Sequence, residues 1–303
     1  MLGMIRRPRS AAADPAAIAQ GIALMLFAGL AFSLSFAFIK ALGKEMPTSQ
    51  VMLFRMGVGL VPLLPLILRA PKGFLKTQRP FGHVYRVTVG FISMAMIYWA
   101  VTRMPLADAA ATQFTMPLFL TALSVPLLGE AVGWRRATAT VVGFGGVLVM
   151  LKPSTGGFGA LDIAYVVALG AAFFYALAAI AMRQLGQTEP ALRTTIYFSS
   201  VAALAGGIGC LFDWVDPTPR QLALLIAIGL VGGMGQYAMV SSYAKAPATI
   251  VAPFDYSQLV WATALGFFVW GETPAANAFL GATILAAAGL YIFRREAVRR
   301  RDG

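Results

Sequence analysis

The chain has 303 residues, of which 59% are hydrophobic and 12% are charged, and its mean hydropathy is +0.75. A water-soluble domain of this length needs far more polar surface, so the composition excludes a soluble protein and predicts an integral membrane protein. The formal net charge of +12 does not indicate a nucleic-acid partner, because the basic residues lie between apolar runs and form no stripe with interleaved aromatic side chains.

Three kinds of chemistry are excluded by residues that the chain lacks. The single cysteine, Cys210, excludes an internal disulfide, and the single histidine, His83, excludes a Cys/His metal cluster. The sequence contains no G-x-x-x-x-G-K-[ST] motif, which excludes ATP hydrolysis at a P-loop. We therefore expect no catalytic residue, no metal and no cofactor, and we expect His83 to be solvated in a loop.

The basic segment 1–16 precedes a long apolar run and has the general character of a signal peptide. The run is too long for one and has no convincing small-residue cleavage site, so we interpret it as a retained first helix behind a cytoplasmic tail. Apolar runs of about 18–24 residues then recur, each long enough to cross a hydrocarbon core of about 30 Å. The ten predicted membrane spans are 17–39, 48–68, 84–102, 106–128, 134–151, 161–182, 192–212, 221–242, 248–270 and 276–293.

The distribution of lysine and arginine predicts the orientation of these spans. With the N-terminus in the cytoplasm, eighteen of the 24 basic residues, Arg86 among them, fall on the cytoplasmic side, and Arg55 lies within a span. Because cytoplasmic loops carry the excess of basic residues, both termini are predicted to be cytoplasmic. Anchoring explains the basic tail 294–303, and contact with anionic lipid is compatible with it.

The second half of the chain repeats the first. Segment 102–130 aligns without a gap on segment 244–272, and segment 40–47 matches segment 183–190 at nearly the same offset. Five spans in each copy place the second copy upside down relative to the first, which is the architecture of many secondary transporters.

The predicted fold class is therefore an all-α integral membrane protein. It has ten transmembrane helices in two inverted five-helix repeats, at 17–151 and 161–293.

A Gly-Glu pair closes the fourth and the ninth span, with Glu130 and Glu272 on opposite faces of the membrane. Glycine is suited to end a helix, and a glutamate near the start of the next helix is favoured by the helix dipole. We interpret both pairs as structural, with proton coupling as the alternative role.

The repeated pattern of a proline, an apolar run and Gly-Glu, followed by the glycine-bearing segments VVGFGGVLVML and LGATILAAAGLYIF, resembles the EamA domain of the drug/metabolite transporter superfamily. Two such domains cover essentially the whole chain. The resemblance implies ten helices, a bacterial inner membrane, cytoplasmic termini and the carriage of small metabolites, often by export. Within the family the chain is most similar to bacterial amino-acid exporters, including those for aromatic amino acids.

Two prolines inside spans mark the candidate substrate site. Pro117 has no N–H and so frees the main-chain carbonyl of Gln113, as Pro253 does for Thr249. Such carbonyls are tolerated at membrane depth only against protein or a wet cavity. Because Asp255 aligns with Gln113, we expect both side chains to face the interior between the repeats, in contact with substrate or in an interhelical hydrogen bond.

Arg55 is the other charged residue within a span, where a charge costs about 2.5–3.5 kcal/mol on insertion scales. Three interpretations stay open: its side chain snorkels to the surface, binds a substrate carboxylate, or pairs with Asp255. Asp255 is the only carboxylate well inside a span, which makes it the candidate for proton coupling. The predicted substrate-binding residues are Arg55, Tyr98, Trp99, Gln113, Gln236, Tyr237, Asp255, Gln258 and Trp261.

Two of the aromatic residues have alternative roles. Trp99 is also suited to be an interfacial anchor, and Trp261 either lines a cavity or packs in the bundle.

The sequence thus predicts a secondary transporter that exports small metabolites of no net charge through a cavity between the repeats, with amino acids, aromatic ones included, as favoured substrates. A pocket of aromatic and amide side chains suits a zwitterion better than a sugar phosphate. One alternative is an exporter of drugs or lipophilic cations with the same fold. The other is a membrane-embedded lipid-modifying enzyme, which the lack of a His, Asp, Glu or Cys cluster disfavours.

The expected partners are the small-molecule substrate and the lipid bilayer, with no nucleic acid. A monomer is compatible with the sequence.

Overall fold

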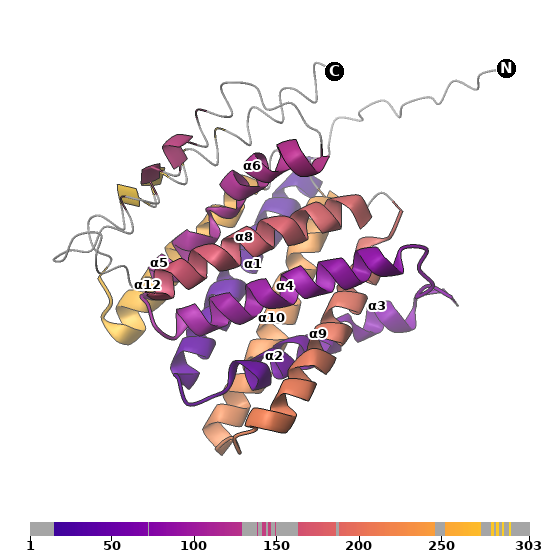
Figure 1. The fold of residues 1–303 in the computed structure, drawn as a ribbon, viewed down its shortest axis with the longest axis horizontal. Coiled ribbons are helices and arrows are strands. Elements are labelled where there is room, and N and C mark those ends of the chain that lie inside the picture. The colour runs from indigo at the N-terminus through magenta and orange to yellow at the C-terminus, as the bar shows by residue number, and fades with distance from the viewer. Residues whose placement is uncertain are drawn as a thin grey trace.

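The computed structural model describes residues 15–71, 73–128, 163–185, 188–245 and 252–273, together with single residues between 138 and 149 and between 280 and 291. Every regular element within these ranges is a helix, as the composition predicts (Figure 1). The elements are α1 (Pro15–Leu42), α2 (Thr48–Gly57), η1 (Val58–Leu63), α3 (Leu64–Leu68), α4 (Pro80–Val101), α5 (Leu106–Gln113), α6 (Met116–Leu128), α8 (Ile163–Leu185), α9 (Ala191–Asp213), α10 (Pro219–Lys245), η3 (Ala252–Tyr256) and α12 (Ser257–Trp270).

Six helical segments in the described part of the chain are long and apolar enough to cross a membrane, and they correspond to predicted spans one, two, three, six, seven and eight. The fourth predicted span consists of α5 and α6, and the ninth consists of η3 and α12. The fifth span (134–151), the tenth span (276–293) and the tails lie almost wholly outside the described residues. The all-helical membrane class is therefore confirmed, whereas the number of ten spans stays a prediction.

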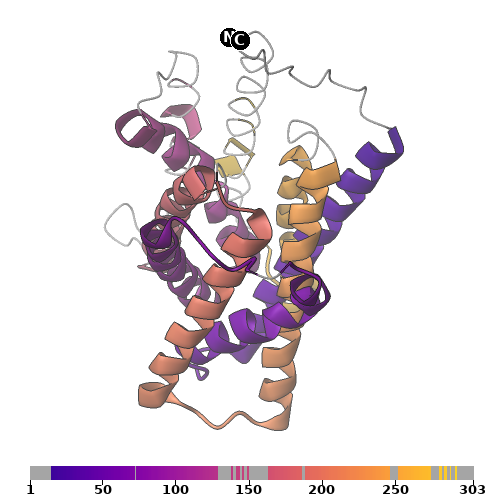
Figure 2. The ribbon, with the colours of Figure 1, turned by 90° about the vertical axis from the view of Figure 1, so that its right-hand side faces the viewer.

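The helices turn at two opposite ends of the bundle. At the first end, which we call the Gly43 end, Gly43 adopts a positive φ of 71° after α1, a conformation that favours glycine. The connection from α9 to α10 lies at the same end (Figure 2). There, the buried side-chain amide of Gln50 in α2 joins the connection by accepting from the Val215 N–H at 3.2 Å and donating to the Val215 carbonyl at 3.0 Å. The second end, the Gly73 end, holds the connection from α3 to α4.

Helices of the first half pack mainly on helices of the second half. The contacting pairs are α1 with α10, α4 with α8, and α2 with α9, and the last two pairs lie side by side in Figure 1. Small residues allow this close approach. A Cβ at Gly206 of α9 would lie 2.8 Å from the main-chain nitrogen of Leu53, and a Cβ at Gly233 of α10 would lie 2.4 Å from the carbonyl oxygen of Gly59. The two halves are therefore interleaved.

The second predicted span is continuous but changes its helical form at its middle. After α2 the chain continues as the 3₁₀ helix η1, which contains Pro62, and then as α3. Proline cannot donate the hydrogen bond of a regular α-helix, which explains the tighter segment. Gly229 of α10 packs against this region, since a Cβ there would lie 2.6 Å from Cβ of Val58.

At the Gly73 end a buried carboxylate holds the connection from α3 to α4 against the start of α9. Glu189 accepts from the Thr77 hydroxyl at 2.6 Å and from the Gln78 N–H at 3.3 Å, and it pairs with Arg193. The Thr77 hydroxyl, together with Arg193 and the Gln78 amide, lowers the pKa of Glu189 below its ordinary value of 4.5, although burial opposes the shift.

The expectation that His83 is solvated in a loop is wrong. His83 lies in the first turn of α4 and is 4% exposed. Its ring stacks on Tyr197 of α9 with centroids 4.4 Å apart, and its Nε2 lies 4.0 Å from Glu189. The helix begins earlier than the apolar run does, because Pro80 is well tolerated in a first helical turn.

The lowered pKa of Glu189 makes the stability of this end depend on pH. Because the folded-state pKa lies below the unfolded one, the stabilisation is complete above about pH 4.5 and is lost as the pH falls through the folded pKa. We expect Glu189→Gln to lower the melting temperature of the detergent-solubilised protein by a few degrees at pH 7, and the difference from wild type to shrink below pH 4.5.

Glu45→Gln is the control, since Glu45 is exposed at the opposite end. A difference between Glu189→Gln and wild type that stayed constant from pH 7 to pH 3 would contradict the role of the ionised carboxylate.

Candidate substrate site between two broken helices

The fourth and ninth predicted spans both depart from regular α-helix, and the departures include equivalent positions of the repeat. α5 ends at Gln113, and α6 begins at Met116 after a turn at Phe114 and Thr115. In the second copy, the 3₁₀ helix η3 ends at Tyr256 and α12 follows directly. The gapless alignment pairs Phe114 with Tyr256, so the irregular segments of both copies contain the same aromatic position.

The hydrogen bonds around Phe114 explain the first interruption. The N–H of Phe114 donates to Ala111 at 3.1 Å and the N–H of Thr115 donates to Thr112 at 3.1 Å, which are tightened, 3₁₀-type contacts. Pro117 then supplies no N–H for the carbonyl of Gln113. The sequence predicts a continuous fourth span with a freed carbonyl at Gln113, and the structure places a turn at Phe114 and Thr115 directly after that residue. The corresponding carbonyl of the second copy, that of Thr249, lies outside the described residues.

The two interruptions face each other. The rings of Phe114 and Tyr256 stack with centroids 4.5 Å apart and an interplanar angle of 19°. Gly29 of α1 closes this region from the other side, because a Cβ there would lie 2.6 Å from the Ser257 hydroxyl. Two enclosed polar atoms beside the stack, Nε2 of Gln113 and Oγ of Ser257, have no hydrogen-bond partner in the part of the chain that the structure describes. The repeat thus brings Gln113 and Asp255 together as neighbours of one aromatic stack.

Asp255 lies in η3 and is half-buried, next to Tyr256. The segment η3 that carries Asp255 packs on α1 and continues into α12.

Arg55 does not pair with Asp255. Its guanidinium interacts with the hydroxyl of Tyr98 from α4 and lies flat on α10, where a Cβ at Gly232 would come within 2.2 Å of Arg55 Cζ. Arg55 is 9% exposed, so its side chain does not snorkel to the surface. The structure thus excludes the snorkelling and the salt bridge, and contact of Arg55 with a substrate stays a prediction.

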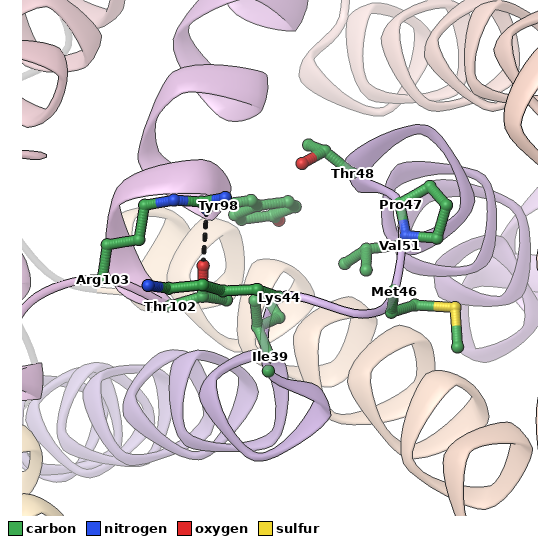
Figure 3. Close-up of a pocket in the computed structure, with 10 residues that line it drawn as sticks. Ile39, Lys44, Met46, Pro47, Thr48, Val51, Tyr98, Thr102 and Arg103 are labelled. Carbon is green, nitrogen blue, oxygen red and sulfur yellow. Dashed lines mark hydrogen bonds between the residues drawn. The ribbon is translucent and has the colours of Figure 1, made fainter.

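The Gly43 end contains a pocket of about 180 Å³ that reaches Tyr98 from outside (Figure 3). Figure 3 shows Thr102 and Arg103 on one side and Pro47, Thr48 and Val51 on the other.

Trp99 lies beside this pocket and supports Arg103. The Arg103 guanidinium stacks on the Trp99 ring at 4.0 Å and donates to the Trp99 carbonyl at 2.8 Å.

The remaining predicted residues are distributed along α10 and α12. Gln258 is buried, and its carbonyl accepts from the Ser33 hydroxyl of α1 at 2.9 Å. Gln236 is half-buried, whereas Tyr237 and Trp261 are exposed. The arrangement therefore divides the predicted set into a group around Asp255, a group around Arg55 and two exposed aromatic residues.

The packing of Arg86 was not expected, because the sequence counts it among the basic residues of the cytoplasmic side. It is the seventh residue of α4, and its guanidinium lies over the ring of Phe198 from α9 at 4.2 Å. Its Nη1 is enclosed and has no hydrogen-bond partner among the described residues. In the sequence, the one indication that Arg86 packs against another helix is the amphipathic start of α4, in which Arg86 is followed one turn later by Gly90.

A second missed feature is an ion pair that joins the two halves at the Gly43 end. Lys40 in the last turn of α1 pairs with Glu272 after α12, and its Nζ also donates to the Met104 carbonyl at 2.8 Å. The Lys40 ammonium lies 5.4 Å from the ring centroid of Trp270.

Glu272 has a contact that the sequence does not predict. Gly271 ends α12, with a left-handed φ of 66°, as predicted. Glu272 turns back and accepts from the first N–H of α5, that of Leu106, at 3.0 Å, so its charge favours the dipole of α5, while the start of the next predicted span lies outside the described residues. Gly266 allows this, since a Cβ there would lie 3.0 Å from Glu272 Oε2. Its counterpart Glu130, with Gly129, lies outside the described residues.

Asp108 adds a second buried carboxylate to this region. It lies in the first turn of α5, is 5% exposed and accepts from the Tyr165 hydroxyl of α8. Within the described ranges, no three His, Cys, Asp or Glu side chains approach one another as a metal site requires.

The sequence profile of the EamA-like transporter family matches residues 19–152 and again residues 162–294. The chain belongs to the EamA-like transporter family. This EamA-like protein is a multi-pass membrane transporter and not an enzyme, as the sequence predicts.

Named relatives resemble the EamA-like chain over almost its whole length. It is 32% identical to an S-adenosylmethionine uptake transporter of Rickettsia prowazekii, over 91% of this chain and 93% of the relative. It is 30% identical to a riboflavin transporter of Vibrio cholerae, over 93% and 95% of the two chains. It is 29% identical to a pseudopaline exporter of Pseudomonas aeruginosa, over 91% and 96%.

These relatives do not support the narrower expectation of an aromatic amino-acid exporter, because their names give other cargo and both directions of transport. A solved crystal structure with 20% sequence identity superimposes with a TM-score of 0.61 and covers 95% of this chain and 99% of its own. That likeness concerns the fold alone.

The Lys40–Glu272 pair gives a prediction for stability. Removing one partner leaves a charge in a partly buried site, whereas removing both does not. We expect Lys40→Met and Glu272→Leu each to lower the melting temperature, and the double variant to be more stable than the sum of the single effects implies, by a coupling energy on the order of 1–3 kcal/mol. Thermal unfolding in detergent measures all three variants.

Lys245→Met is the matched control, because Lys245 is exposed and donates to the exposed Gln20 at 3.0 Å. Strict additivity of the two single effects would show that the ion pair does not hold the two halves together.

Proposed function

We propose that the protein is a secondary transporter of small metabolites without net charge, with amino acids, aromatic ones included, and compounds that carry an amino-acid group as its cargo. The observation that carries this proposal is the stack of Phe114 on Tyr256, which joins two helix breaks deep in the bundle. Phe114 lies eight residues, or about 12 Å, from the start of α5. Irregular backbone at such depth is stable only where protein or a hydrated cavity covers it, and transporters bind cargo at broken helices of this kind.

The names of the relatives support a small organic cargo. S-adenosylmethionine, which a relative takes up, carries both the ammonium and the carboxylate of an amino acid. Riboflavin, the cargo of another relative, is aromatic, and the stacked rings offer a comparable surface. Nε2 of Gln113 and Oγ of Ser257, which have no hydrogen-bond partner among the described residues, are available for hydrogen bonds to such molecules.

Alternating access is the proposed mechanism. The repeats at 17–151 and 161–293 rock against each other in inverted orientation, so that the site opens to each face in turn. We propose the bacterial inner membrane as the location, with the Gly73 end and both termini in the cytoplasm, because that end carries the excess of basic residues. Export is the proposed direction, and a monomer suffices for the mechanism.

Substrate contact is proposed for all nine predicted residues, in two depths of the path. Gln113, Asp255 and Gln258 surround the helix breaks, while Arg55 and Tyr98 continue the path toward the pocket at the Gly43 end. The other proposed contacts are Trp99, Gln236, Tyr237 and Trp261. Buried arginine in the path disfavours the alternative of a lipophilic-cation exporter.

Transport by proteoliposomes tests the proposed function. We expect vesicles with the purified full chain to accumulate at least one amino acid from a panel of labelled aliphatic, sulfur-containing and aromatic amino acids, and to accumulate lipophilic cations no faster than empty vesicles do. Loading the panel inside or outside the vesicles determines the direction. Transport of tetraphenylphosphonium but of no amino acid would establish the cation exporter instead.

Proton coupling, if it drives transport, is proposed to run through Asp255, because the ammonium group of the cargo and a proton compete for one carboxylate. We expect a pH difference across the vesicle membrane to raise the flux of the wild type severalfold and to leave the flux of Asp255→Asn unchanged. Asp216→Asn, in the exposed loop before α10, is the control. A wild-type flux without pH dependence would eliminate the coupling.

A further inference from the structure

We propose that the pocket at the Gly43 end is a binding subsite for the carboxylate group of the cargo, and that Arg103 is the residue that receives this group. This inference rests on the proposed function and names the chemical group that this end of the transport path recognises. Arg103 is one of the few basic residues that the predicted topology places outside the cytoplasmic side of the membrane.

The first argument is the size and the lining of the pocket. Its volume of about 180 Å³ is below that of pockets for drug-sized ligands, about 300–1,000 Å³, so it accommodates one end of a metabolite. The polar side chains that line it carry a hydroxyl group or, at Lys44 and Arg103, a positive charge, and no acidic side chain is among the described residues of the lining. Glu45 is exposed next to Lys44 but does not line the pocket. A pocket with charges of one sign attracts the group of opposite charge, here an anion.

The second argument is that the guanidinium of Arg103 is held in place before any ligand arrives. It stacks on the Trp99 ring at 4.0 Å, and its Nη1 donates to the Trp99 carbonyl at 2.8 Å and to the Thr102 hydroxyl at 2.9 Å (Figure 3). Because both of these hydrogen bonds come from Nη1, Nε and Nη2 make none with the described residues. Nε and Nη2 form an edge that binds a carboxylate through two parallel hydrogen bonds.

Two weaker positive groups lie at the same pocket. Lys44 lines it directly after the left-handed turn at Gly43, and its side chain is exposed to solvent. Pro47 and Thr48 line it where α2 begins, and no side chain caps the first N–H groups of that helix. The positive end of the helix dipole therefore adds to the charge of Arg103. Water and salt screen the exposed ammonium, so Arg103 is the stronger partner for an anion.

The third argument is that the pocket leads to a residue of the proposed path. Tyr98 lines the pocket although it is only 6% exposed, and its hydroxyl interacts with the guanidinium of Arg55. Arg55 in turn lies against α10 at Gly232, inside the bundle. A carboxylate that Arg103 holds at the surface is therefore separated by Tyr98 from a second guanidinium at greater depth.

The repeat places a basic residue at the equivalent position of the other end. The gapless alignment pairs Arg103 with Lys245, the last residue of α10. α10 begins at the Gly43 end, after its connection with α9, and runs to the opposite end of the bundle (Figure 2). Both copies of the repeat therefore carry a cation at this position, one at each end, as the inverted arrangement requires.

The preference for an amino acid over its carboxamide tests the assignment to Arg103. The amide keeps the ammonium group and the side chain but loses the negative charge. For the amino acids of the panel that wild-type proteoliposomes transport, we expect kcat/KM to exceed that of the corresponding amide. We expect Arg103→Gln to lower this ratio about tenfold, the low end of the effect of a hydrogen bond to a charged group, because the pocket is open to water. The loss is expected as a higher KM for the amino acid, with the transport of the amide unchanged.

A conservative variant and a matched control separate binding from folding and from surface charge. Arg103→Lys keeps a positive charge and is expected to keep an intermediate ratio, because lysine binds a carboxylate as a point charge. Arg220→Gln is the control, since Arg220 is exposed at the same end, in the first turn of α10, and does not line the pocket. It removes the same charge and is expected to keep the wild-type ratio. Transport of the amide by each variant reports how much folded transporter the vesicles contain.

Each outcome is decisive. An unchanged ratio in Arg103→Gln, or an equal loss of amino-acid and amide transport, would show that Arg103 only supports the end of α4 and would overturn the inference while the proposed function stands. A wild-type ratio of unity, or an equal fall of the ratio in Arg220→Gln, would overturn it as well. Wild-type vesicles that transport neither the amino acids nor the amides would instead overturn the proposed function and this inference with it.

Discussion

The structure depends on a constraint that lipid imposes: every backbone donor and acceptor must find a partner within the protein. α5 and α6 violate the regular helix at Phe114, and η3 and α12 do so at Tyr256, yet each interruption covers the other through the stacked rings. Neither break is stable alone in a bilayer. The repeat places the two irregular segments at the same internal position, where they pack on each other. The backbone and side-chain groups that regular helices leave unbonded there form a polar surface to which a cargo molecule can bind.

The packing of the halves follows from the same arrangement. Because α1 packs on α10 and α4 packs on α8, the main hydrophobic core among the described residues contains side chains of both halves, and small residues such as Gly206 and Gly233 set the distance between the helices. The contacts at the two ends differ in kind. Glu189 holds a connection at the Gly73 end, whereas Lys40 and Glu272 join α1, α5 and α12 at the Gly43 end. A movement that opens the Gly43 end must therefore break a partly buried ion pair and remove the N-terminal partner of α5.

The charges of the interior are few, which makes each one informative. Arg55 has a partner in Tyr98 and Asp108 has one in Tyr165, whereas Nη1 of Arg86 has no hydrogen-bond partner among the described residues. Charges that are unpaired at membrane depth are expensive and mark the places where a substrate or ion interacts. Family membership agrees with a small organic cargo, and the relatives carry chemically different molecules on one fold.

The sequence by itself determined the membrane class, the repeat and the family, because hydropathy, Gly-Pro spacing and the match of 102–130 with 244–272 are local properties of the chain. It also determined that Gln113 and Asp255 are equivalent and that Pro117 frees the carbonyl of Gln113. Only the tertiary structure decided which charges meet. Lys40 and Glu272 are 232 positions apart, and Arg86 looks like one more basic loop residue until α8 and α9 enclose it. Contacts of this kind depend on how helices from different repeats cross, and no pattern within one helix contains that information.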